Sequence, residues 1–254
     1  MTHKPTERVL NILSLLASQA KGLPLTQISL LLQIPKSTIS PILQEMTDKK
    51  FLYLQEADNT YAIGISSYCI GAAYERDTAL FPYLKEEMKK ISDEINEICQ
   101  VGVLTGPDVL YILKQDPAIS SAIKIISYVG KKLPAYCTAL GKALLCEHSY
   151  EELKKLYPEG ITPQTAKTVT DLQALHQQLQ TIHQTNIATE YEEISSQICC
   201  FAVPIRVDNH KAYAMSVSMP LFRTSDEKIA QTKKLLLQAK AKIENLANRP
   251  ITKY

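Results

Sequence analysis

The most constraining feature of this sequence is the hydrophobic period of its first 65 residues. An amphipathic helix is expected to begin near Pro5, a favourable residue for a first helical turn, and to end at Lys21-Gly22-Leu23-Pro24. A second short helix is expected over residues 26–33, and Ile34-Pro35 leads tightly into a third. The apolar residues of the third helix are Ile39, Ile42, Leu43 and Met46. Three short helices with a tight turn between the last two indicate a helix-turn-helix.

After Lys49-Lys50 the spacing of hydrophobic residues changes from that of a helix to that of β-strands. The runs at residues 51–54 and 60–63 flank the turn-forming pair Asp58-Asn59, which predicts a two-stranded wing. We therefore expect a winged helix-turn-helix domain over residues 1–65, followed by a linker helix over residues 66–78.

The remaining residues, 79–254, mix helical and strand periods. One long amphipathic helix is expected over residues 84–98, and a hairpin is expected from residues 198–207 and 211–219. Capping-box patterns at Thr170-Asp171-Leu172-Gln173 and Thr224-Ser225-Asp226-Glu227 predict two further helices. Other strands are expected at 99–104, 108–114 and 122–127, and other helices at 139–147 and 149–157. Because these segments do not alternate strictly, we expect an α+β domain with an antiparallel sheet.

Composition narrows the class of protein. The chain has 254 residues and a formal charge of +2, with six cysteines that show no metal-ligand spacing. No run approaches the roughly 18 to 20 apolar residues that cross a bilayer, and the N-terminus lacks the layout of a secretory signal. We therefore expect a cytoplasmic protein with no membrane partner, no metal and buried free thiols.

The third helix is the candidate nucleic-acid reader. Lys36, Ser37 and Thr38 at its start suit phosphates, while Ser40 and Gln44 could reach base edges in the major groove. The alternative is a small packing or dimerisation domain. Residues 1–65 hold six Lys and Arg against five Asp and Glu, a net charge of +1, so we expect modest affinity that depends on a dimer.

Two further segments are candidate small-molecule sites. Small residues at 133–145 run into a helix whose first N–H groups could hold a carboxylate, although Gly141 and Ala143 could equally serve close packing. On the predicted hairpin, Ser216 and Ser218 share one face of the sheet, and with Cys200 and Glu190 they could grip a small polar ligand. The alternative is edge hydration and a solvated acidic loop.

Catalysis is not expected. Cys200 could be paired with His183 or His210, but the five scattered histidines supply no triad spacing, and glycine-rich phosphate loops are absent. We expect no catalytic residue and no cofactor.

These pieces, in this order, resemble the IclR family of bacterial transcriptional regulators along nearly the whole chain. The N-terminal matches are Arg8-Val9-Leu10-Asn11-Ile12-Leu13, Ile34-Pro35-Lys36-Ser37-Thr38-Ile39 and Tyr61-Ala62-Ile63-Gly64. The C-terminal matches are Leu133-Pro134, Ala139-Leu140-Gly141-Lys142-Ala143-Leu144-Leu145, Cys200-Phe201-Ala202-Val203-Pro204-Ile205 and Ser216-Val217-Ser218-Met219-Pro220.

The resemblance implies a winged helix-turn-helix joined by a linker helix to a GAF-like effector domain. It implies a homodimer or homotetramer that binds double-stranded operator DNA as a repressor or activator. It also implies a small-molecule effector, usually an organic acid or an aromatic metabolite. By position, the effector would meet the N–H groups of Ala139 and Leu140, the side chains of Glu190, Cys200, Ser216 and Ser218, and an apolar wall of Ile125 and Leu133.

The sequence departs from the family pattern at several positions. Pro41 replaces a common Arg in the third helix, Glu190 replaces the usual Asp, and Gln197 and Met219 replace glycines. Pro41 and the weak charge sustain a rival interpretation, in which the chain is a metabolite sensor that acts through a protein partner. An ionised Glu190 would repel a carboxylate ligand unless a proton is shared or the ligand donates a hydroxyl.

Overall fold

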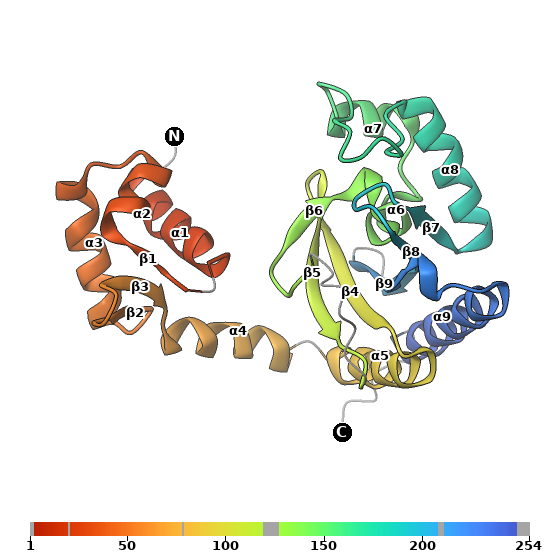
Figure 1. The fold of residues 1–254 in the computed structure, drawn as a ribbon, viewed down its shortest axis with the longest axis horizontal. Helices are drawn as coiled ribbons and strands as arrows, with labels where there is room; N and C mark the ends of the chain where they lie inside the picture. Colours follow the sequence, from red (N-terminus) through yellow and green to blue (C-terminus); the bar gives the residue numbers. More distant parts are fainter. Residues whose placement is uncertain (1–2, 20, 78, 119–126, 208–210, 248–254) are drawn as a thin grey trace. The chain divides into compact units, whose positions relative to one another are not determined.

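A computed structural model of the chain describes residues 3–19, 21–77, 79–118, 127–207 and 211–247 (Figure 1). The chain divides into two compact units, Met1–Ala79 and Leu80–Tyr254, and each is described by itself.

The N-terminal unit contains the predicted helices α1 (Lys4–Ala17), α2 (Leu25–Leu32) and α3 (Lys36–Asp48). Their apolar stripes meet in one core that includes Ile12, Leu16, Ile28, Ile39 and Leu43, each at most 1% exposed. Of the apolar residues predicted for the third helix, Ile39, Leu43 and Met46 are buried, while Ile42 is half-buried.

The wing is the antiparallel pair β2 (Leu52–Gln55) and β3 (Thr60–Ile63). Asn59 closes its turn at φ 52°, a left-handed conformation that Asn adopts more readily than most residues. A short strand, β1 (Leu23–Pro24), pairs with the other side of β3 and gives the order β1-β3-β2; the sequence pattern did not predict it. Helix α4 (Ile65–Asp77) follows the wing.

The C-terminal unit is built on an antiparallel sheet of order β6-β5-β4-β9-β8-β7. The central ladder joins β4 (Ile98–Thr105), β9 (Lys211–Pro220) and β8 (Ile198–Val207). The flanking strands are β5 (Asp108–Gln115) and β6 (Lys132–Pro134) on one side and β7 (Ala188–Tyr191) on the other. The α+β fold with an antiparallel sheet is thus confirmed.

Helices cover both faces of this sheet (Figure 1). Helices α5 (Phe81–Ile95) and α9 (Asp226–Ala247) pack on one face over an apolar core that contains Val101, Phe201 and Met219. The other face carries the 3₁₀ turn η1 (Ala135–Cys137) and helices α6 (Ala139–Leu145), α7 (Tyr150–Leu156) and α8 (Leu172–Thr185). The candidate small-molecule residues lie on this second face.

Several details differ from the sequence prediction. The helix predicted over residues 84–98 ends at Ile95, and Ile98 is the first residue of β4. The two caps lie one residue later than predicted: Asp171 accepts from the Ala174 N–H at 2.7 Å, and Ser225 accepts from the Lys228 N–H at 3.1 Å. The strands β6 and β7 were missed because they are too short to show a period. The predicted strand over residues 122–127 and the predicted turn at residues 208–210 lie outside the described residues, except for Ser127, which is not in a strand.

Candidate functional site

The outer face of α3 presents the predicted DNA-contacting residues. Lys36, Ser37, Ser40 and Gln44 are exposed, and Thr38 is half-buried, because the opposite face of the helix is held in the core. The entry to the helix is fixed by a tight connection, in which the Ser29 hydroxyl donates to the Ile34 carbonyl at 2.6 Å. The structure therefore places these residues on one accessible helix face.

Two features of α3 bear on its use as a reader. Gln44 Nε2 donates to Asp48 Oδ1 at 2.9 Å, so its amide is already engaged one turn along the helix. Pro41 lies inside the helix, where it lacks the N–H that would bond to the Ser37 carbonyl. A base contact by Gln44 therefore requires exchange of the Asp48 bond.

The predicted small-molecule residues of the sheet form one cross-strand row. Glu190 on β7 lies opposite Cys200 on β8, which lies opposite Ser218 on β9. Ser216, two residues away on the same face, lies opposite Gln100 on β4. The row is buried: Glu190 is 0% exposed, and the two serines are 1% and 3% exposed.

Hydrogen bonds connect this row across the sheet. Cys200 Sγ lies 3.2 Å from Ser218 Oγ, and Ser218 Oγ donates to Gln100 Oε1 at 3.4 Å. The other end of the Gln100 amide donates to the Ser127 hydroxyl. Gln100 and Ser127 were missed at the sequence level because nothing local indicates that β4 lies beside β9.

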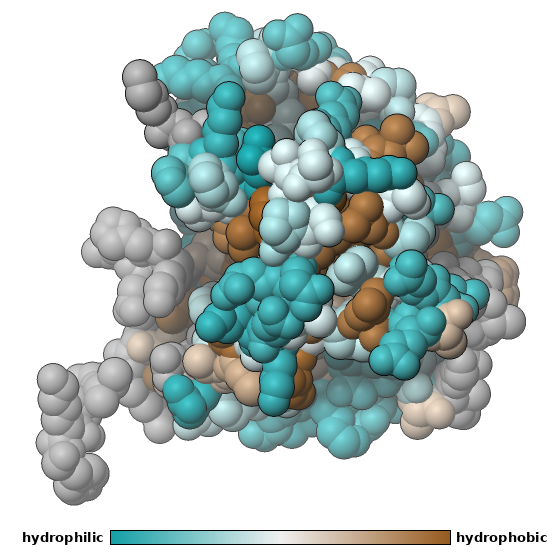
Figure 2. Space-filling view, turned by 90° about the vertical axis from the view of Figure 1, so that its left-hand side faces the viewer, coloured by the Kyte–Doolittle hydropathy of each residue, from teal (hydrophilic) through white to brown (hydrophobic). Residues whose placement is uncertain are grey.

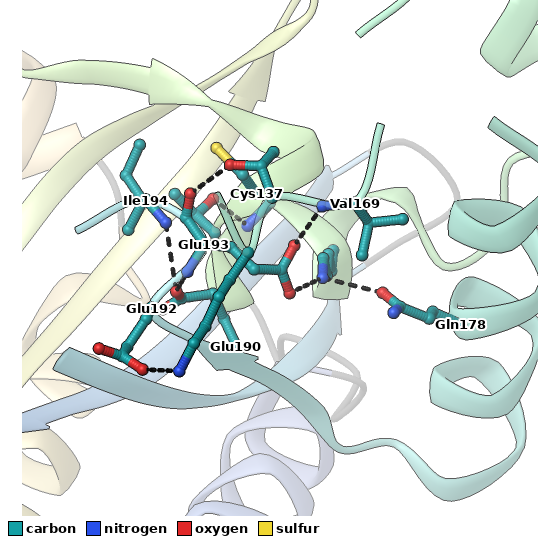
Figure 3. Close-up of polar contacts among 12 residues, drawn as sticks. Cys137, Val169, Gln178, Glu190, Glu192, Glu193 and Ile194 are labelled. Carbon is teal, nitrogen blue, oxygen red and sulfur yellow. Dashed lines mark hydrogen bonds and ion pairs between the residues drawn. The ribbon is translucent and has the colours of Figure 1, made fainter. Parts of the chain in front are cut away.

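Glu190 is the most unusual group of the row. Its Oε1 accepts from the backbone N–H groups of Glu193 and Ile194, the latter at 3.3 Å (Figure 3). Its Oε2 is buried and has no hydrogen-bond partner among the described residues. Burial raises the pKa of this carboxyl group from 4.5 to about 7, although hydrogen bonds from the Glu193 N–H, the Cys200 side chain and the Ile194 N–H lower it.

A buried ion pair lies beside Glu190. Lys142 on α6 is 1% exposed and binds Glu193 in the loop after β7, and its Nζ also donates to Gln178 Oε1 on α8 at 2.8 Å (Figure 3). The Val169 N–H donates to the other oxygen of Glu193 at 3.4 Å. Sequence reasoning took Lys142 only as part of a family match, and its position on a seven-residue helix gave no sign that it is buried.

The start of α6 shows why small residues follow Leu133. Thr138 caps the helix by accepting from the Gly141 N–H at 3.1 Å. A Cβ on Gly141 would lie 2.2 Å from the backbone of Ala135, so glycine is required for α6 to pack on η1. The close-packing alternative for Gly141 thus has a direct structural basis. Ala139, Leu140 and Leu133 are buried in the same cluster, whereas Ile125 lies outside the described residues.

The thiols of this unit are poor nucleophiles. Burial raises the pKa of Cys99, Cys137 and Cys199 to about 12, and it raises that of Cys200 well above 9.0. Within the described residues no group of three or more His, Cys, Asp or Glu side chains could hold a metal ion, and no helix is long and apolar enough to cross a membrane.

The chain is similar to known regulators over both units. Residues 5–56 match the family model of the IclR helix-turn-helix domain, and residues 72–245 match that of the bacterial transcriptional regulator IclR C-terminal domain. KdgR of Escherichia coli K12 is 26% identical over 239 residues, which cover 93% of this chain and 89% of KdgR. XynR of the same organism is 29% identical over 245 residues, covering 92% of each chain.

Solved structures share the fold. An IclR transcriptional regulator from Alicyclobacillus acidocaldarius superposes with a TM-score of 0.87 at 20% identity, covering 98% of this chain and 100% of that one. An IclR homologue from Microbacterium hydrocarbonoxydans, in complex with 4-hydroxybenzoate, gives a TM-score of 0.83 at 21% identity, covering 94% of this chain and 96% of that one.

Proposed function

Because the chain belongs to the IclR family of bacterial transcriptional regulators, we propose that it binds operator DNA as a homodimer or dimer of dimers under the control of a small organic acid. The family is one of DNA-binding regulators with an effector domain, and it is not enzymatic. We assign DNA binding to residues 1–65, the linker to residues 66–78, and effector binding to residues 79–254.

The exposed face of α3 is the observation that carries the DNA-binding part of the proposal. Lys36 and Ser37 stand at the helix N-terminus, where a cation and backbone N–H groups favour phosphate, and we include Thr38 with them. Ser40 and Gln44 follow on the same face, one and two turns along, at the spacing of residues that contact base edges.

Exposed apolar side chains on α4 support a dimer. Ile65, Tyr68 and Ile70 are 62%, 70% and 61% exposed. A hollow of about 900 Å³ lies beside the first turn of α4 and is lined by Tyr53 and Leu54 of the wing. Apolar surface of this kind is costly in water, and a second copy of the chain would cover it.

The buried row on the C-terminal sheet supports the effector part. We assign the effector to Leu133, Ala139, Leu140, Glu190, Cys200, Ser216 and Ser218, with Ile125 as a further wall residue. The 4-hydroxybenzoate complex of the relative from Microbacterium hydrocarbonoxydans supports an organic acid as the ligand class.

A titration of the DNA upstream of the protein's own gene tests the regulator proposal. We expect Lys36→Ala to weaken binding to all sequences and to lower the salt dependence by about one released counterion. We expect Gln44→Ala to cost about 1–3 kcal/mol and to relax the sequence preference. Lys155→Ala, an exposed lysine of α7, is the control and should bind as the wild type does.

The second candidate is a metabolite sensor that acts through a protein partner. Pro41 inside α3 favours it, because the helix there lacks one backbone bond. The regulator proposal would be excluded if the protein bound every DNA fragment weakly and if Lys36→Ala and Gln44→Ala left that binding unchanged. The sensor proposal would then remain.

A further inference from the structure

Pro41 occupies the middle of the outer face of α3. It lies beyond the first turn of the helix and is exposed, so its ring does not pack in the core of the N-terminal unit. A proline at such a position lowers the stability of a helix, because it removes a backbone hydrogen bond and its ring crowds the carbonyl of Ser37. Packing within the chain therefore does not account for Pro41.

The spacing of residues along α3 places Pro41 among the predicted base-contacting residues. Side chains three, four and seven positions apart lie on the same face of a helix. Ser37, Pro41 and Gln44 have this spacing, and Ser40 lies beside them. All four residues are exposed. A helix that presents Ser40 and Gln44 to the major groove therefore presents the Pro41 ring as well.

Pro41 also lies in the half of the helix that comes closest to the bases. In helix-turn-helix proteins the N-terminal residues of the second helix contact base edges. Gln44, one turn further along, has its amide bound to Asp48 Oδ1 at 2.9 Å. Ser40 and Pro41 are therefore the side chains of this face, after the first turn, that meet base edges without a rearrangement.

The chemistry of the Pro41 ring suits one feature of a base edge. The ring carries C–H groups alone, and proline has no backbone N–H to donate. In the major groove the bases present hydrogen-bond donors and acceptors, and thymine adds an apolar group, its C5-methyl. A polar edge placed against the ring would lose hydrogen bonds to water without replacing them. A thymine methyl group, in contrast, gains free energy when the ring removes it from water.

We propose that Pro41 is a specificity-determining residue, which selects a thymine in each operator half-site through van der Waals contact between its ring and the C5-methyl group. The inference rests on the proposed function, because it requires α3 to lie in the major groove. It adds an apolar contact with one base to a helix face whose other exposed residues, Lys36, Ser37, Ser40 and Gln44, are polar or charged.

Removal of single methyl groups from the DNA tests the inference. The full-length protein first selects binding sites from a library of randomised duplex DNA. Each thymine of the selected half-site is then replaced by deoxyuridine, which lacks only the C5-methyl group. We expect one such replacement to weaken binding about fourfold, the change that corresponds to one methyl-sized group removed from water. At the same position 5-methylcytosine should bind better than cytosine by a similar factor. Equal affinity after every replacement would overturn the inference.

Variants of Pro41 test whether this residue makes the methyl contact. Pro41→Val keeps an apolar side chain and Pro41→Asn introduces a polar one, while both restore the backbone N–H and have similar helix propensities. We expect Pro41→Val to remain sensitive to the missing methyl group, and Pro41→Asn to bind the thymine and deoxyuridine sites equally. Pro158→Asn, at an exposed proline of the C-terminal unit, is the control and should behave as the wild type does. A methyl effect that persists in Pro41→Asn, or that disappears in Pro41→Val, would overturn the inference.

The selection from the DNA library separates this inference from the proposed function. A protein that selects a DNA sequence but shows no dependence on a thymine methyl group retains the regulator proposal and loses the inference. A protein that selects no sequence overturns both, and the metabolite sensor that acts through a protein partner then remains.

Discussion

A carboxyl group in a protein interior is usually ion-paired, fully hydrogen-bonded or protonated. Among the described residues Oε2 of Glu190 has no hydrogen-bond partner, and the buried Lys142 ammonium is bound to Glu193. The effector domain therefore buries a carboxyl group whose pKa is about 7. Ionisation of that group lowers the stability of the folded state.

This cost predicts how stability depends on pH. The Glu190 pKa is about 7 in the folded chain and 4.5 as a model value, so stability is lost as pH rises from 4.5 through 7. We expect Glu190→Gln to be more stable than the wild type by up to about 3 kcal/mol at pH 8, and by under about 1 kcal/mol at pH 5. Urea unfolding at the two pH values measures this, with Glu159→Gln as control; an equal difference at both would contradict the buried ionisation.

Single residues of the row were partly predictable. Strand alternation was enough to place Ser216 and Ser218 on one face, but Gln100 joins them only because β4 lies beside β9. That adjacency depends on the order of the strands in the sheet, which no local sequence pattern reveals.

The backbone at Gln197 could not be predicted either. Its φ of 64° lies in the left-handed region, which glycine occupies without strain. Gln197, which replaces a glycine of the family pattern, therefore lies at a strained position.

At the scale of elements, the Lys142–Glu193 pair joins three segments. It connects α6 to the loop after β7, and the bond from Lys142 to Gln178 adds α8 (Figure 3). Because the Glu193 N–H also donates to Glu190, the pair holds the loop that positions the candidate effector residue.

Removing one partner of this pair should be costly. We expect Lys142→Met to destabilise the protein by about 3–5 kcal/mol, because it leaves the Glu193 carboxylate buried without its cation. The double variant with Glu193→Gln should recover part of that loss, which a double-mutant cycle by urea unfolding measures. Lys154→Met, which breaks an exposed pair with Glu151 on α7, should change stability by under about 1 kcal/mol. Additive losses in the cycle would contradict a coupled pair.

Helix positions were more predictable than their caps. The amphipathic periods located α1, α3 and α5, and capping-box patterns located α8 and α9, yet both predicted caps lay one residue too early. Neighbouring Thr, Asp and Ser residues offer equivalent oxygens, and only the backbone at the first turn decides which one accepts. In α3, by contrast, the apolar spacing alone decides which residues face outward.

At the scale of the whole molecule, weak charge and exposed apolar surface occur together in residues 1–65 and α4. The face in Figure 2 shows hydrophilic residues over most of the surface, with separate hydrophobic patches between them. A net charge of +1 in residues 1–65 gives little electrostatic attraction to DNA, so two linked recognition helices would have to supply the affinity.

Disrupting the proposed dimer should therefore weaken operator binding. We expect the double variant Tyr68→Glu/Ile70→Glu on α4 to shift the protein towards monomer in sedimentation analysis, and to lower operator affinity by about 10²-fold or more through lost avidity. Phe222→Glu removes a side chain that is 71% exposed in the C-terminal unit, and it should change neither quantity. Unaltered sedimentation of the α4 variant would show that this face is not the dimer contact.

The fold class was predictable because the spacing of hydrophobic residues shows which segments of each unit are helices and which are strands. The switch from helical to strand steps near Lys50 marked the wing, and interleaved strands marked the antiparallel sheet. The pairing of β6 and β7 at the sheet edges was not predictable, since strands of three and four residues carry too little pattern. The candidate site was foreseeable only where its residues share a strand or a motif.

The packing of Gly141 against Ala135 has a consequence for genetics. Any side chain at this position would collide with the backbone of η1, beside the residues assigned to the effector. A mutational selection for unresponsive regulators would therefore recover Gly141 together with ligand-contacting positions, although its contribution is steric. Substitutions of Gly141 disturb the packing of α6 on η1 and not a ligand contact. They should therefore be excluded when such a selection is used to map the effector pocket.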